Sequence, residues 1–127
     1  MSYVSKLVEL CNTLGCNYLL DEPLKYHTTF KVGGNCKIFI EVNSVDTITT
    51  LLKYFKSNGI QYAILGNGSN VIASDEGFNG AVLHFGKDFS NIELLDDTTI
   101  KSLAGTVLSK LCLLAKDNSL TGLEFAY

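Results

Sequence analysis

The sequence has 127 residues, which is enough for one folded domain with a core and too few for two ordinary domains. Apolar residues make up 46% and charged residues 18%, a globular composition that excludes an intrinsically disordered chain. All ten basic residues are lysines, interspersed among thirteen acidic ones, and the net charge of -3 offers no basic surface for nucleic acid or an anionic membrane.

The lengths of the apolar runs bear on membrane insertion and secretion, and the spacing of the cysteines bears on metal binding. No apolar run approaches eighteen residues, so the sequence predicts neither a signal peptide nor a membrane span. The four cysteines show no C-x-x-C spacing and no histidine at zinc-ligand distance, so we expect no metal site. Reduced, mostly buried thiols in a cytoplasmic protein are the simplest interpretation.

The first half of the chain predicts two helices and two strands. Apolar spacing predicts an amphipathic helix over residues 1–14 and a strand over 37–42. Ser44 then offers a helix N-cap, with apolar residues at period 3.6 up to Gly59, and residues 60–65 form a second strand. Strand, helix and strand make a βαβ unit, which implies a parallel pair with a right-handed crossover.

Beyond residue 70 the pattern changes to short strands with short connections. Strands are predicted over 81–85, 92–95 and 99–103, and no crossover helix fits between them, which suits antiparallel pairing. A third helix is predicted from Thr106 until Lys116 to Asn118 close it. The sequence therefore predicts an α+β fold, with a βαβ subdomain over about 20–70 and the start of an antiparallel subdomain over 71–127.

The strongest candidate for chemistry is the segment Gly66–Asn70, directly after the second predicted strand. Two glycines spaced by one residue let successive backbone N–H groups approach an anion, which matters in a chain without arginine. An ordinary turn is the alternative, since Asn-Gly and Gly-Ser are common turn pairs. A G-x-G-x-x-G dinucleotide motif is disfavoured because position 71 is Val and no helix can start there.

A second glycine-marked segment, Tyr26 to Gly34, could line a ligand or form an edge strand that ends in a turn. No serine, cysteine or second histidine lies at a spacing from His27 that would indicate a catalytic or metal site, so we expect His27 to be exposed or hydrogen-bonded. His84, within an apolar strand, is predicted to pack rather than to catalyse. Asp96 and Asp97 are predicted to form a hairpin turn.

In combination and in order, these segments resemble a known family. From about Thr28 onward the chain is similar to the N-terminal FAD-binding part of the UDP-N-acetylenolpyruvoylglucosamine reductases, also called UDP-N-acetylmuramate dehydrogenases. The motifs that carry the resemblance are Thr28-Thr29-Phe30-Lys31-Val32-Gly33-Gly34, Ile64-Leu65-Gly66-Asn67-Gly68-Ser69-Asn70-Val71, Gly77-Phe78-Asn79-Gly80, Ala104-Gly105 and Leu120-Thr121-Gly122-Leu123-Glu124-Phe125.

The resemblance implies a fold and a cofactor. The fold would be the FAD-binding, PCMH or vanillyl-alcohol-oxidase-like type, in which FAD lies between a small α+β part and an antiparallel part. The loop after the second strand would hold the FAD pyrophosphate, while Gly105 and the segment from Thr121 would approach the flavin and the ribityl chain. The residues so assigned to FAD are Leu65, Gly66, Asn67, Gly68, Ser69, Asn70, Gly105, Thr121, Gly122 and Glu124.

The family's activity is the reduction of UDP-N-acetylglucosamine enolpyruvate to UDP-N-acetylmuramate, a cytoplasmic step of peptidoglycan synthesis that serves cell shape and cell division. NADPH reduces FAD, and the reduced flavin then passes hydride to the enolpyruvyl double bond of this nucleotide sugar. An FAD-linked oxidase of the same superfamily and a flavin-free phosphate-binding module are the alternatives. The sequence says nothing of the oligomeric state.

The family's catalytic Arg, Ser and Glu come later than the matched region, so no catalytic residue is assigned. An apolar-rich terminus ending at Tyr127 and the absence of arginine predict a piece of a longer protein, with an FAD-binding domain incomplete at its C-terminus and no substrate domain. Such a piece is expected to be inactive by itself.

Overall fold

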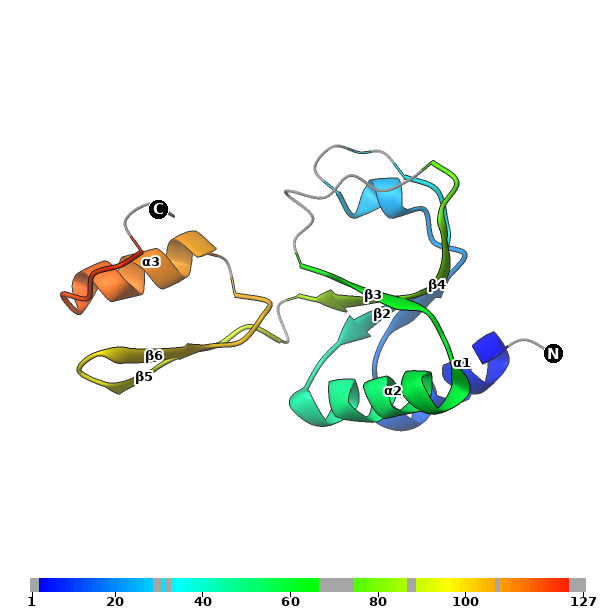
Figure 1. Ribbon diagram of the computed structural model, residues 1–127, viewed down its shortest axis with the longest axis horizontal. Helices are drawn as coiled ribbons and strands as arrows, with labels where there is room; N and C mark the ends of the chain where they lie inside the picture. The colour runs from blue at the N-terminus through cyan, green and yellow to red at the C-terminus, as the bar shows by residue number, and fades with distance from the viewer. Residues whose placement is uncertain are drawn as a thin grey trace.

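The structure is a computed structural model that describes residues 3–28, 31, 33–66, 75–86, 89–106 and 108–123. These residues form two parts, which are visible side by side in Figure 1. The larger part holds a four-stranded sheet with two helices on one face, and the smaller part holds a two-stranded hairpin and a third helix. The predicted α+β class with both parallel and antiparallel sheets is confirmed.

The larger sheet has the strand order β1-β2-β4-β3. Strand β2 pairs parallel with β4, β4 pairs parallel with β3, and β1 pairs antiparallel with β2. The two strands of the predicted βαβ unit are therefore parallel in one sheet, as predicted, but they do not pair with each other because β4 lies between them. The strands are β1 (Tyr18–Leu20), β2 (Cys36–Val42), β3 (Tyr62–Leu65) and β4 (Phe78–Phe85).

Strand β4 also corrects the position at which the two parts separate. The predicted antiparallel pairing of residues 81–85 is wrong, since β4 is the parallel partner of two strands and the antiparallel pairing begins only after Phe85. Ala81, Val82 and Leu83 are all buried, so β4 is covered on both faces. A continuous apolar run of this kind is typical of central parallel strands.

Helices α1 (Tyr3–Leu14) and α2 (Val45–Asn58) cover the same face of this sheet (Figure 1). The Thr47 N–H donates to the Ser44 hydroxyl oxygen over 3.1 Å, so the predicted N-cap is confirmed, and α2 ends at Gly59 in the left-handed region. A core forms between the helices and the sheet from Leu7, Cys11, Ile38, Ile40, Val42, Leu51, Phe55, Ala81, Leu83 and Phe85.

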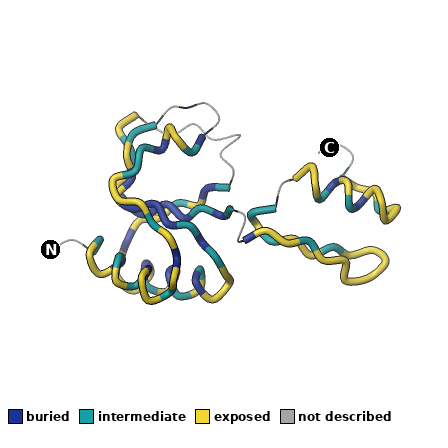
Figure 2. The backbone as a smooth tube through the Cα atoms, turned by 180° about the vertical axis from the view of Figure 1, so that it is seen from behind, coloured by how far each residue is buried: buried dark blue, intermediate teal, exposed yellow. Residues whose placement is uncertain are grey.

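The smaller part contains β5 (Ile92–Asp96), β6 (Thr99–Ser102) and α3 (Leu108–Asp117). The antiparallel pairing of β5 with β6 and the turn at Asp96 are confirmed, and the Asp96 carboxylate accepts the Thr98 N–H over 2.9 Å. Figure 2 shows that exposed residues dominate this part. In α3 the buried residues are Cys112 and Ala115.

Candidate functional site

The parallel strands β2, β3 and β4 all end at one edge of the larger sheet. In register, Glu41 of β2 lies beside His84 of β4, and His84 lies beside Leu65, the last residue of β3. Gly66 follows Leu65 directly, so the chain enters the predicted anion-binding loop at this edge. Ligands of open α/β sheets bind outside the carboxyl ends of the strands. Residues 67–70 themselves lie outside the described residues.

Further along the chain, the backbone around Asp75 and Gly77 lies very close to the backbone around Gly34 and Asn35. A Cβ on Gly34 would overlap the carbonyl oxygen of Asp75, and a Cβ on Gly77 would overlap the carbonyl oxygen of Asn35. The Phe78 N–H donates to the same Asn35 carbonyl over 2.9 Å. Two of the motifs that carry the family resemblance, at 28–34 and 77–80, therefore meet in space. At Gly34 and at Gly77 any residue with a Cβ would clash with the backbone of the other segment, which explains the glycines.

The segment from Tyr26 to Gly34 is no strand in its described residues. A 3-10 turn, η1 (Leu24–Tyr26), is followed by a bend at His27 and Thr28. Leu24 is buried and packs in a small second core with Cys36, Phe39, Leu65 and Val82, on the other face of the sheet from α1 and α2. The edge-strand interpretation is thus wrong for these residues, whereas residues 29, 30 and 32 lie outside the described part.

Both histidines pair with a glutamate and contact the same phenylalanine. His27 Nε2 lies 2.6 Å from Glu22 Oε2, and His84 Nδ1 lies 2.9 Å from Glu41 Oε2. The ring of His27 stacks on Phe39 with centroids 3.9 Å apart, and the ring of His84 is tilted against Phe39 at 5.5 Å. The predicted hydrogen bonding of His27 and packing of His84 are confirmed. The two carboxylate partners were not predicted: Glu22 meets His27 across the turn η1, and Glu41 meets His84 from a neighbouring strand 43 residues away in sequence.

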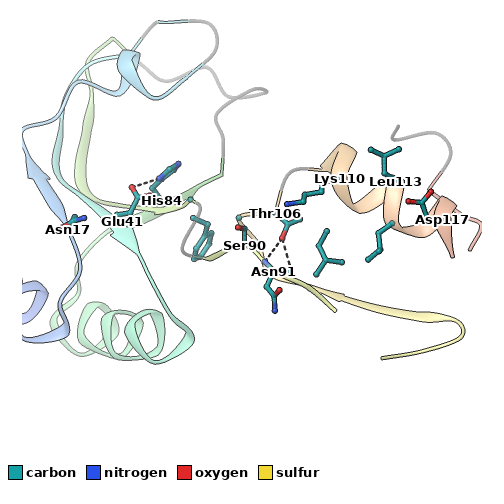
Figure 3. A pocket seen from close by; sticks show the side chains of 14 residues that line it. Asn17, Glu41, His84, Ser90, Asn91, Thr106, Lys110, Leu113 and Asp117 are labelled. Carbon is teal, nitrogen blue, oxygen red and sulfur yellow. Dashed lines mark hydrogen bonds and ion pairs between the residues drawn. The ribbon is translucent and has the colours of Figure 1, made fainter. Parts of the chain in front are cut away.

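A cavity of about 1080 Å³ lies between the two parts (Figure 3). Glu41 and His84 line it from the larger part, and Gly105, Thr106 and Lys110 line it from the smaller part. The cavity therefore adjoins the edge at which β2, β3 and β4 end. Its size is that of a site for a small molecule or a cofactor.

Gly105 joins the two parts of the molecule. Its N–H donates to the Phe89 carbonyl over 2.8 Å, and a Cβ at this position would overlap the Gly86 carbonyl oxygen. Thr106, the next residue, accepts the Asn91 N–H at its hydroxyl over 3.1 Å. The chain needs a glycine at 105 for its own packing, so the N–H of Gly105 is already used. A contact of Gly105 with a flavin stays a prediction.

The segment after α3 packs against the end of that helix. The Leu120 N–H donates to the Ala115 carbonyl over 2.8 Å, and the Cys112 thiol lies 3.7 Å from the Leu123 carbonyl. Thr121 and Gly122 are exposed and, in the part of the chain that the structure describes, neither belongs to the cavity lining. Glu124 lies outside the described residues. The assignment of this segment to a flavin stays a prediction.

The four cysteines are free and buried, as predicted. Burial raises the pKa of the Cys11 thiol to about 12 and that of Cys36 to about 11, so both thiols stay protonated near neutral pH. Across the described ranges there is no cluster of three potential metal ligands. No helix in the described ranges is long and apolar enough to cross a membrane.

Comparison with known proteins identifies the family. A family model described as "FAD binding domain" matches residues 36–127, which is most of the chain. The UDP-N-acetylenolpyruvoylglucosamine reductase of Alkaliphilus oremlandii is 41% identical over 108 residues, covering 85% of this chain and 35% of the relative. The reductase of the same name from Clostridium tetani is 39% identical over 124 residues, covering 98% of this chain and 39% of the relative.

The solved structures agree with the sequence comparisons. The crystal structure of UDP-N-acetylenolpyruvylglucosamine reductase from Thermus caldophilus matches with a TM-score of 0.59 and 29% identity, over 86% of this chain and 36% of that one. The chain spans 35–41% of the length of the curated relatives it matches. The chain therefore belongs to the FAD-binding domain family, and it matches the FAD-binding part of the UDP-N-acetylenolpyruvoylglucosamine reductases.

Proposed function

We propose that this chain binds FAD at the carboxyl edge of β2, β3 and β4 and in the adjoining cavity. The observation that carries the proposal is the position of Leu65 and Gly66: the first glycine of the family's loop directly follows a parallel strand at this edge. Anions bind there because backbone N–H groups in a glycine-rich turn converge on them. The family match supports FAD as the ligand, and the pyrophosphate is the anion that we assign to this loop.

The described residues fit this cofactor at the end of β3. No described atom lies within 4 Å of the place where a Cβ on Gly66 would be, so none of the described residues blocks this backbone from a ligand. We assign the pyrophosphate to the backbone N–H groups of Gly66–Asn70, and we assign the flavin and ribityl end to Gly105 and to the segment from Thr121 to Glu124. When bound, FAD supplies the hydride-accepting and hydride-donating chemistry, and the protein holds and orients it.

The wider role of the protein follows from the names of its relatives. We infer that this chain is the FAD-binding portion of an NADPH-dependent, cytoplasmic reductase that converts UDP-N-acetylglucosamine enolpyruvate to UDP-N-acetylmuramate for peptidoglycan. The partner molecule is accordingly a nucleotide sugar. The chain has no arginine and no residue to which a catalytic step can be assigned, so the 127 residues alone are expected to give no NADPH-dependent turnover of this substrate.

The binding proposal is tested by titrating FAD into the wild-type chain and a Gly68→Val variant while following flavin fluorescence. A branched Cβ prevents the close approach of backbone to an anion, so the variant is expected to bind at least tenfold more weakly, on the order of 1.4 kcal/mol. Thr49→Val, on the exposed face of α2, is the control for adding valine and is expected to bind like wild type. Absence of FAD binding by the wild type would contradict the proposal, as would equal affinity of the Gly68→Val variant.

A further inference from the structure

His84 occupies a position that the family motifs do not mark. It is the register neighbour of Leu65, one residue before the proposed pyrophosphate loop. Its side chain is 22% exposed and lines the cavity between the two parts (Figure 3). The imidazole therefore lies at the carboxyl edge of the parallel strands, where ligands of such sheets bind.

The hydrogen bond to Glu41 defines which nitrogen of His84 remains available. An ionised carboxylate can only accept, so the 2.9 Å contact with Glu41 requires that Nδ1 carries a proton and donates it. Among the described residues, Nε2 has no hydrogen-bond partner. In the neutral ring Nε2 is an acceptor, and in the imidazolium form it is a donor.

The cavity that Nε2 faces is lined by charged side chains of both signs. The chain has no arginine, and in the described lining of the cavity the basic side chains are His84 and Lys110 and the acidic ones are Glu41 and Asp117. Lys110 reaches the cavity from α3, on the opposite side from β4 (Figure 3). A ligand that bridges the two parts thus meets one basic side chain on each side, His84 on β4 and Lys110 on α3, and one carboxylate on each side, Glu41 and Asp117.

We propose that His84, oriented by Glu41, donates a hydrogen bond from Nε2 to a pyrophosphate oxygen of FAD and takes up a proton when FAD binds. The proposal rests on the proposed function, because it names a further residue of the same site. Glu41 acts as a positioning residue, since its carboxylate holds the ring in place through Nδ1. A charge-assisted hydrogen bond of this kind is stronger than a neutral one.

The groups around His84 define the expected pH dependence and supply a control. Glu41 faces it from β2, His27 lies 6.4 Å away ring to ring, and Lys110 and Asp117 line the cavity from α3. His27 contacts the same phenylalanine, but its Nε2 is bonded to Glu22 and it does not line the cavity among the described residues. Because only the imidazolium form can donate from Nε2 while Nδ1 donates to Glu41, FAD affinity should fall as the pH rises.

The first test measures FAD affinity of the wild-type chain and of His84→Asn and His27→Asn variants at roughly pH 5.5 and pH 8.5. We expect the wild type and His27→Asn to bind about tenfold or more tightly at the lower pH, and His84→Asn to bind weakly and equally at both. Equal affinity of the wild type at both pH values overturns the proposal and leaves FAD binding itself intact. No FAD binding at any pH overturns this proposal together with the proposed function.

A second measurement keeps the proposal testable if His84→Asn fails to fold. The chain has two histidines, so the imidazole NMR signals of the wild type are assigned with the His27→Asn variant alone. Adding FAD at neutral pH is expected to shift the His84 signals toward the imidazolium form and to leave those of His27 in place. In Glu41→Gln, which keeps an acceptor for Nδ1 but no charge, a smaller shift is expected. Unmoved His84 signals under saturating FAD overturn the proposal.

Discussion

The two parts of the molecule differ in how much they bury. The sheet with β2 and β4 has a core of fully buried side chains on the face covered by α1 and α2, and Phe39 and Val82 are buried on the other face. In the hairpin, β5 and β6 have no buried residue, and Leu94 and Leu95 are exposed (Figure 2). Two-stranded hairpins are marginally stable by themselves.

This difference shows where the stability of the chain resides. The larger part has a hydrophobic core between its helices and its sheet, which is what a stable domain requires. The stability of the smaller part depends on packing of the hairpin with α3 and on the junction at Gly105. Because the cavity lies between the two parts, a ligand there contacts one stable wall and one weakly held wall. Binding and order in the smaller part should therefore be coupled.

Leucine truncation gives the largest expected contrast between the two parts. Leu83 is fully buried in β4, and Leu95 is 54% exposed in β5. We expect Leu83→Ala to lower the free energy of unfolding by about 2–5 kcal/mol, because it leaves a cavity in the core. Leu95→Ala should change it by less than about 0.5 kcal/mol. Urea denaturation followed by circular dichroism measures both, and similar losses for the two variants would contradict the comparison.

The junction between the parts is tested by Gly105→Ala. The added methyl group would overlap the backbone carbonyl oxygens of Gly86 and Phe89, so backbone would have to shift to admit it. We expect a loss of about 1–3 kcal/mol in the free energy of unfolding, as for overpacking in a core. Gly66→Ala is the matched control, since no described atom lies near its Cβ position. Equal stability of the two variants in urea would show that the junction tolerates a side chain.

The smallest of these effects is expected at the N-terminus of α2. Ser44→Ala removes the acceptor for the Thr47 N–H and should cost about 1 kcal/mol, because a helix N–H loses its partner. Ser57→Ala, exposed in the last turn of the same helix, should cost little. The thermal unfolding midpoints of the two variants distinguish a serine that caps a helix from a serine that is merely exposed on its surface. A lower midpoint for Ser57→Ala than for Ser44→Ala would contradict this role of Ser44.

Local patterns predicted most elements of the fold but not the strand order. The N-cap at Ser44, the end of α2 at Gly59 and the turn at Asp96 depend on neighbouring residues and were predictable. The insertion of β4 between β2 and β3 depends on pairing between distant residues. The apolar run at 81–83 was compatible with either type of sheet, because periodicity does not identify a strand's partners.

The same limit applies to the candidate site. Glycine spacing and family motifs predict an anion-binding loop after Leu65, and this stays a prediction because residues 67–70 lie outside the described part of the chain. The pairs of Glu22 with His27 and of Glu41 with His84 arise only after the sheet and η1 have formed. The packing role of Gly105 also depends on a distant segment, since the backbone it meets lies at Phe85, Gly86 and Phe89. A short motif cannot show whether a glycine leaves space for a ligand or for a distant backbone segment of its own chain.

Hydrogen exchange of the 127-residue chain with and without saturating FAD tests the central claim most directly, namely that FAD binds at the carboxyl edge of β2, β3 and β4 and spans the cavity to the smaller part. Without FAD, amides of β2 and β4 should exchange slowly and those of β5, β6 and α3 quickly. With FAD, exchange should slow at Gly66, His84 and in the smaller part, with little change in α1 and α2. Unchanged exchange in β5, β6 and α3 under saturating FAD would contradict a cofactor site between the two parts.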